Sequence, residues 1–262
     1  TIRPDSLQPV SEETTQRITA EQAPEQKIEV PDHLGKTHRL LSGHLTEWRS
    51  ASVDEYGAIR SGSLRQLNIR VSPQHLSRTV RIMNALFLAL EARGHQLGIQ
   101  DGFKKAFGVR LNGEPIEFGL EEKFQRIERS EDKNRKQNPW GYHRYEYVST
   151  GTLILKITEW GADGLQKTWS DGKTTKLENC LNDFVVGLLK VAEAVKARRL
   201  KQEQEEQLRR EAERRRQEEA IKRQEELARL QALEQEAANW AKAQQLRTYL
   251  SALKDMLTTK HG

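Results

Sequence analysis

The sequence has a single cysteine, Cys180, among 262 residues, and it has no long apolar run. One cysteine excludes an intramolecular disulfide, which fits a reducing compartment, so we expect a cytoplasmic protein. No stretch approaches the ~20 apolar residues that a membrane-spanning helix needs, and we expect neither a membrane segment nor a signal peptide. Cys180 lies on a predicted apolar helix face, so we interpret it as a small buried hydrophobic residue and not as a nucleophile.

Proline and glycine are both missing from Leu188 to His261. This stretch predicts a long helix, and without a break it would measure roughly 110 Å. We expect its exposed part to form a charged helical rod over residues 196–262. In Lys196–Glu226, basic and acidic side chains follow each other three and four residues apart, a pattern that stabilises an exposed helix by about 0.2–0.5 kcal/mol per pair.

Apolar residues return at the end of this rod. They are Leu227, Leu230, Leu233, Trp240, Leu246, Leu250, Leu253 and Leu257. Residues this apolar need a surface to cover them. The segment therefore either folds back as a helical hairpin or pairs with another chain, as a homo-oligomer or with a protein partner.

Three interpretations of the rod remain open. It is a solvated spacer or weak coiled coil, an oligomerisation element, or a basic strip that binds nucleic acid. The strip would consist of Arg209, Arg210, Arg214, Arg215, Arg216, Lys222 and Arg223. Glutamates such as Glu218 and Glu219 count against the third interpretation, because they repel phosphate.

The rest of the chain divides into two parts. Residues 1–31 are polar and contain four prolines, which predicts a disordered or linker arm. Residues 32–195 have ordinary globular composition and predict one compact domain. The net charge of +5 is a mild basic excess, which permits contact with nucleic acid without requiring it.

Local signals predict an α+β domain with an antiparallel sheet and a buried core helix. Ser72-Pro73 begins a helix that is apolar nearly all round and ends at Gly94. Asn112-Gly113 joins two alternating strands as a hairpin. A second antiparallel pair is expected around Thr150-Gly151, and the pattern Thr175–Glu178 predicts a capping box. Strands joined by short turns favour an antiparallel sheet.

No motif indicates catalysis, a metal or a cofactor. The seven histidines are scattered, the glycines have the spacing of turns, and no nucleophile elbow is present. A metal-dependent nuclease or other effector would need acidic residues clustered on the sheet. The candidates for such a cluster are Glu117, Glu146, Glu159 and Asp171.

One polar loop mixes basic and aromatic residues. Its candidate contacts are Lys133, Arg135, Lys136, Trp140, Tyr142 and Arg144. The basic side chains could pair with phosphates, while an aromatic ring stacks on a base. The alternative is a mobile loop that leads into a strand whose tyrosines pack on the sheet.

Four segments carry a resemblance to a known group. They are Ile28–Leu34, Arg81–His95, Tyr145–Leu153 and Trp169–Lys173. Their order is similar to the C-terminal portion of a group of uncharacterised bacterial proteins. The resemblance covers roughly residues 28–260 and implies no activity. Members of that group carry an N-terminal helix-turn-helix, which this chain lacks. If that segment was removed, the resemblance implies DNA binding for the parent protein and not for this fragment.

These observations favour a non-enzymatic interaction module of a DNA-associated bacterial regulator or mobile-element protein. In this hypothesis the α+β domain binds a partner or nucleic acid, and the C-terminal helix pairs chains. A helix-turn-helix on a dimer reads two half-sites, which gives a dimerising tail a purpose. The alternatives are a nuclease or effector on the sheet and a scaffold subunit of a larger complex.

Overall fold

The computed structural model describes residues 11–100, 106–128, 145–159, 162 and 164–259. They form two compact units, Thr1–Leu200 and Lys201–Gly262. The helices are α1 (Glu12–Glu21), α2 (Arg39–Ser42), α3 (Leu45–Ser50), α4 (Gly62–Gln66), α5 (Leu76–Ala92) and α6 (Leu181–Thr259), with short 3-10 turns η2 (Pro24–Gln26), η3 (Pro73–His75) and η5 (Leu177–Cys180). None of the described helices is long and apolar enough to cross a membrane.

The first unit is built on one six-stranded sheet. Its strands are β1 (Ile69–Arg70), β2 (Gln96–Gln100), β3 (Ala106–Leu111), β4 (Glu114–Glu128), β5 (Tyr145–Ile157) and β6 (Thr168–Ser170). The order is β2-β3-β4-β5-β6, with antiparallel neighbours, and the short β1 runs parallel to β4. The predicted α+β class with an antiparallel sheet is confirmed.

Helix α5 and the first turns of α6 pack on the sheet. Phe118 of β4 contacts Phe87 of α5 and Phe184 of α6, with ring centroids 6.3 and 5.6 Å apart. The rings of Phe107 and Trp169 extend this cluster across the sheet. The alternating apolar residues of β4 are therefore buried against both helices. Helix α5 is the buried core helix that the sequence predicted.

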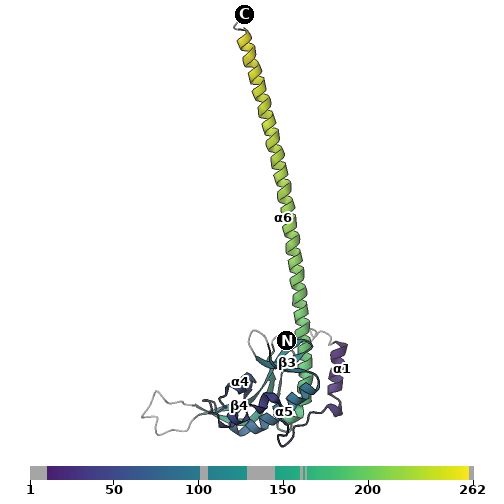
Figure 1. The fold of residues 1–262 in the computed structure, drawn as a ribbon, viewed down its shortest axis with the longest axis vertical. Helices are drawn as coiled ribbons and strands as arrows, with labels where there is room; N and C mark the ends of the chain where they lie inside the picture. The colour runs from purple at the N-terminus through teal and green to yellow at the C-terminus, as the bar shows by residue number, and fades with distance from the viewer. Residues whose placement is uncertain (1–10, 101–105, 129–144, 160–161, 163, 260–262) are drawn as a thin grey trace, which may run out of the picture. The chain divides into compact units, whose positions relative to one another are not determined.

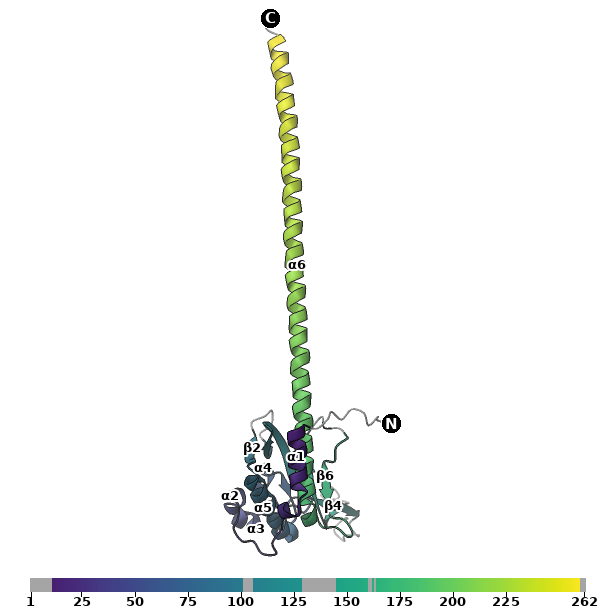
Figure 2. The same cartoon turned by 90° about the vertical axis from the view of Figure 1, so that its right-hand side faces the viewer.

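The N-terminal arm is more ordered than its composition predicted. Residues 11–31 are described, and they include α1, which lies beside the domain part of α6 in both views (Figures 1 and 2). Thr14 donates a hydrogen bond to Glu193 of α6 at 2.9 Å, and Glu21 pairs with Arg93 at 2.6 Å. The sequence predicted a disordered or linker arm over residues 1–31, and residues 11–31 of it are held against the domain by contacts with distant residues.

Two local predictions also differ from the structure. Thr150-Gly151 does not join two strands, since β5 runs through it and Gly151 takes a φ of 72° within the strand. The expected capping box is absent because η5 precedes α6 and Lys176, the residue before η5, makes no side-chain capping bond. The Asn112-Gly113 hairpin is present as expected, with positive φ at both residues.

Helix α6 is a single helix of 79 residues (Figure 1). Its start, from Leu181 to Ala192, belongs to the hydrophobic core of the first unit. The first unit ends at Leu200, close to the expected boundary at residue 195. Of the two expected forms, one long helix and a helical hairpin, the structure has the long helix.

Candidate functional site

The second unit exposes almost every side chain of α6. Between Lys201 and Glu226 the helix is held by local ion pairs such as Arg210–Glu206 at 2.6 Å and Arg214–Glu218 at 3.5 Å. Their i,i+4 spacing is the one predicted for this stretch. Exposed pairs of this kind contribute little stability each, so this segment is a solvated stalk.

Beyond the stalk, large apolar side chains of α6 are exposed. Leu227, Leu230, Leu233 and Trp240 have between 53% and 65% of their surface accessible, and Leu246, Tyr249 and Leu250 have between 56% and 64%. Leu253 is half-buried, and Leu257 lies in the helix with its side chain outside the described part. Exposed apolar residues in this number indicate an interaction surface.

These residues do not share one face of the helix. A straight α-helix turns by about 100° per residue. Leu227, Leu230, Leu233 and Trp240, which we call the Leu227 patch, therefore centre on one side, while Leu246, Tyr249, Leu250 and Leu253, the Leu250 patch, centre roughly 170° away. The spacing predicted a single face, and the unbroken helix divides it into two patches that one straight partner helix cannot cover together.

The two patches also lie in segments of opposite charge. Residues 225–241 contain four glutamates and one arginine, a net charge of −3. Residues 242–257 contain three basic residues and one aspartate, a net charge of +2. A surface that presents the first segment is therefore electrostatically complementary to one that presents the second.

The predicted basic-aromatic loop falls outside the described residues, so Lys133, Arg135, Lys136, Trp140, Tyr142 and Arg144 have no described position. The strands on either side of it are described and carry the same chemistry. Arg126 of β4 lies over the ring of Tyr145 of β5, 4.3 Å from its centroid. Tyr147 contacts Tyr56 edge-on at 4.7 Å, and Arg70 lies 4.8 Å from the centroid of Tyr56.

A buried carboxylate lies on β4. The Glu122 side chain is 0% exposed, and its Oε1 is 2.9 Å from Nδ1 of His75. The hydroxyls of Ser72 and Ser149 approach the same nitrogen at 3.2 and 3.3 Å. A nucleophile relay needs the hydroxyl and the carboxylate on different ring nitrogens, so this arrangement orients His75 without activating a serine.

The pKa of Glu122 is lowered. Burial alone would raise it, but hydrogen bonds from the Ser149 hydroxyl and the Ser72 N–H outweigh that effect. The carboxylate is therefore charged in the folded domain, where it accepts hydrogen bonds from the Ser72 N–H and the Ser149 hydroxyl. Sequence patterns gave no signal for this cluster, because its members are far apart in the chain.

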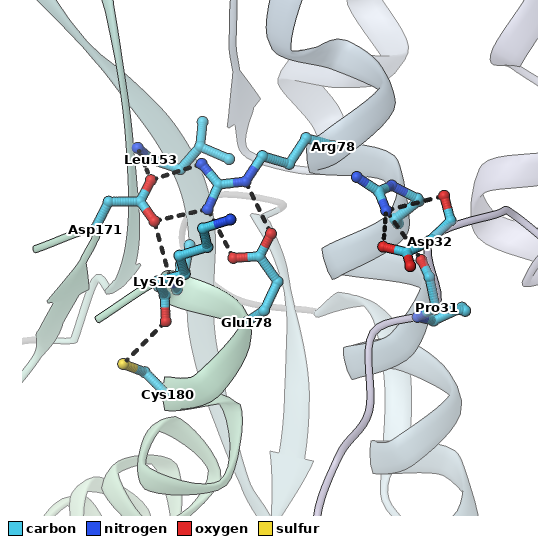
Figure 3. Close-up of polar contacts among 10 residues, drawn as sticks. Pro31, Asp32, Arg78, Leu153, Asp171, Lys176, Glu178 and Cys180 are labelled. Atoms are coloured by element: carbon cyan, nitrogen blue, oxygen red, sulfur yellow. Dashed lines mark hydrogen bonds and ion pairs between the residues drawn. The ribbon is translucent and has the colours of Figure 1, made fainter. Parts of the chain in front are cut away.

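A second ionic cluster joins α5 to η5, the turn before α6, and to the residue that follows β6 (Figure 3). Arg78 donates to Asp171 at 2.7 and 2.8 Å and to Glu178 at 2.7 and 2.9 Å. Asp171 also accepts the N–H groups of Leu153 and Leu177, both at 2.9 Å. Asp171, one of the carboxylates considered for a nuclease, is therefore fully engaged in holding the fold.

Cys180 lies beside this cluster and is half-buried (Figure 3). Its Sγ is 3.7 Å from the carbonyl oxygen of Lys176. Burial raises the pKa of the Cys180 thiol, with nearby carboxylates such as Asp183 adding to the effect. A thiol with a raised pKa is a poor nucleophile, in keeping with a packing role.

The described residues contain no group of three histidine, cysteine or acidic side chains placed to hold a metal ion. Glu159 accepts the backbone N–H of Glu117 at 3.1 Å, and Glu146 is exposed. The nuclease alternative therefore has no supporting cluster in this part of the chain. Comparison of the chain with protein-family models, curated proteins and solved structures finds no match.

Proposed function

We propose that this chain is an interaction module that self-associates through the end of α6 and binds a partner or nucleic acid through its α+β domain. The observation that carries the proposal is the exposure of the Leu227 and Leu250 patches on an unbroken helix. The resemblance described above supports a place in a DNA-associated bacterial regulator or mobile-element protein.

The charges favour a second copy of the chain as the partner that covers these patches. The Leu227 patch lies in the segment of net charge −3, and the Leu250 patch lies in the segment of net charge +2. The first patch of one chain therefore complements the second patch of another, and repels its own equivalent. Because the patches lie on roughly opposite sides, each chain keeps one patch free, and association continues beyond the dimer as the concentration rises.

Multi-angle light scattering of two patch variants tests this proposal. Leu230→Glu/Leu233→Glu disrupts the Leu227 patch, and Leu250→Glu/Leu253→Glu disrupts the Leu250 patch. Each variant alone is expected to be a monomer, while an equimolar mixture forms a 1:1 dimer, because each chain supplies the patch that the other lacks. Leu208→Glu is the control, since Leu208 is equally exposed but lies in the stalk.

Three outcomes contradict the proposal. A monomeric mass for the intact chain at all concentrations overturns self-association. A variant that still dimerises alone shows that a patch pairs with its own equivalent. An equal loss in Leu208→Glu shows that the patches are not the contact.

A further inference from the structure

A pocket of about 650 Å³ lies between the loop after α3 and the α4–β1 segment. Three arginines line it: Arg60, Arg65 and Arg70. The guanidinium groups of Arg60 and Arg65 are exposed and form no hydrogen bond or ion pair with a described residue. By contrast, Arg78 and Arg93 of the same domain are paired with carboxylates. Two unpaired guanidinium groups in one pocket form a site for an anion with several oxygens.

Aromatic rings continue from this pocket along the sheet. Arg70 lies between the rings of Tyr56 and Phe124, 4.8 and 5.5 Å from their centroids. Tyr147 contacts Tyr56 from the side, and Arg126 pairs with Tyr147 across the strands. Arginine and aromatic side chains thus alternate from the pocket to the end of the β4–β5 ribbon.

The loop that carries Tyr56 is fixed by its own hydrogen bonds. Oδ1 of Asp54 accepts the N–H groups of Tyr56 and Ala58, both at 2.9 Å, and Gly57 takes a φ of 81° to close the turn. Oδ2 of Asp54 lies 3.7 Å from Arg70. This carboxylate is therefore occupied by the turn, and Glu55 is the other acidic residue that lines the pocket.

We infer that this surface binds single-stranded nucleic acid, with a phosphate held by Arg60 and Arg65 and bases stacked along the Tyr56 ring and the ribbon. Positive charge in a groove beside aromatic rings is the arrangement that single strands bind without sequence preference. A duplex hides its bases and so gains nothing from the rings. The inference rests on the proposed role of the domain as the nucleic-acid-binding part, and it is independent of self-association.

Fluorescence anisotropy with a labelled 15-nucleotide single strand tests the inference, in DNA and RNA versions, at low salt. Arg60→Ala/Arg65→Ala is expected to weaken binding by about ten- to hundredfold and to reduce the slope of log K against log salt by about 0.7, because one phosphate contact is lost. Arg60→Lys/Arg65→Lys keeps the charge but loses the forked donors, so an intermediate loss is expected. Tighter binding of the DNA strand and tighter binding of the RNA strand support the inference equally.

Lys173→Ala/Lys176→Ala is the matched control, because it removes the same charge from exposed residues of the domain that do not line the pocket. An equal loss in this control, or equal competition by a duplex, overturns the inference in favour of general electrostatic attraction. Absence of binding by the intact chain at low salt overturns it outright. A chain that self-associates and binds no single strand removes this inference alone and leaves the proposed self-association standing.

Discussion

Arg78 and Asp171 form a two-pronged ion pair in which both Nη atoms of the arginine donate to the carboxylate, at 2.8 and 2.7 Å. The same carboxylate accepts two backbone N–H groups, from the middle of β5 and from η5. Asp171 follows β6, so one side chain ties the sheet, α5 and the entry to α6 together (Figure 3).

Replacing Asp171 with alanine should therefore destabilise the domain strongly. It leaves Nη1 of the partly buried Arg78 and two backbone N–H groups without their acceptor, while Glu178 still pairs with the rest of the guanidinium. We expect a loss of about 2–4 kcal/mol in the free energy of unfolding. Asp32→Ala is the control, since the Asp32 side chain is 99% exposed and its ion pair with Arg81 is long, at 3.6 Å. Urea denaturation measures both, and equal losses would contradict the role given to Asp171.

The stability of the domain should also fall in acid. Burial disfavours the charged form of Asp171, but hydrogen bonds from Arg78 and from backbone N–H groups outweigh it and lower the pKa. A lowered pKa in the folded state contributes stability above the unfolded-state value, about 3.9, and that contribution is lost as the pH falls toward the folded-state pKa.

The Asp171→Asn variant isolates this effect. The difference in free energy of unfolding between the wild type and the variant should be constant near pH 7 and should shrink below about pH 4. Denaturation curves at a series of pH values measure it. A difference that stays constant down to pH 3 would show that the carboxylate gains nothing from its charge in the folded state.

Gly187 of α6 allows the ring of Trp169 to lie against the helix. A Cβ at this position would come within 2.2 Å of the indole ring. Gly187→Ala should therefore cost about 1–3 kcal/mol, although alanine favours a helix more than glycine does. Trp169→Phe removes the outer ring, so the double variant should be more stable than the sum of the two single losses predicts. Strictly additive losses would contradict the steric explanation.

Local signals explain which parts of the fold could be predicted. The core helix α5 and the Asn112-Gly113 hairpin depend on periodicity and turn chemistry within a few residues, and both were expected. The order of α1 depends on Glu21 with Arg93 and on Thr14 with Glu193, contacts between residues far apart in the chain. A polar segment does not reveal such contacts in its own composition.

The candidate surfaces, too, could be predicted only where they depend on local spacing. Spacing alone predicted that leucines near the end of α6 would need a partner. Their separation into two patches depends on whether the helix stays unbroken between Trp240 and Leu246. The residues in this segment do not by themselves indicate whether the helix continues or turns. The pocket around Arg60 is lined by residues between Asp54 and Arg70, and only the folded sheet brings the ring of Tyr147 beside Tyr56 at its edge.

Charge reversal on α6 tests whether the two segments recognise each other. Glu234→Lys/Glu236→Lys makes the acidic segment basic, and Lys242→Glu/Arg247→Glu makes the basic segment acidic. Each of these double substitutions alone should weaken self-association roughly fivefold to fiftyfold at low salt, because an attractive contact between the two segments becomes repulsive. Glu218→Lys/Glu219→Lys, in the stalk, is the control and should have little effect.

The chain with all four substitutions restores complementary segments with their signs exchanged. Its self-association should therefore recover most of the loss, and sedimentation equilibrium measures this directly. Added salt should weaken the wild type and the fourfold variant alike, since both depend on charges at an exposed helix surface. A fourfold variant no stronger than either pair alone would show that the glutamates and the basic residues do not meet.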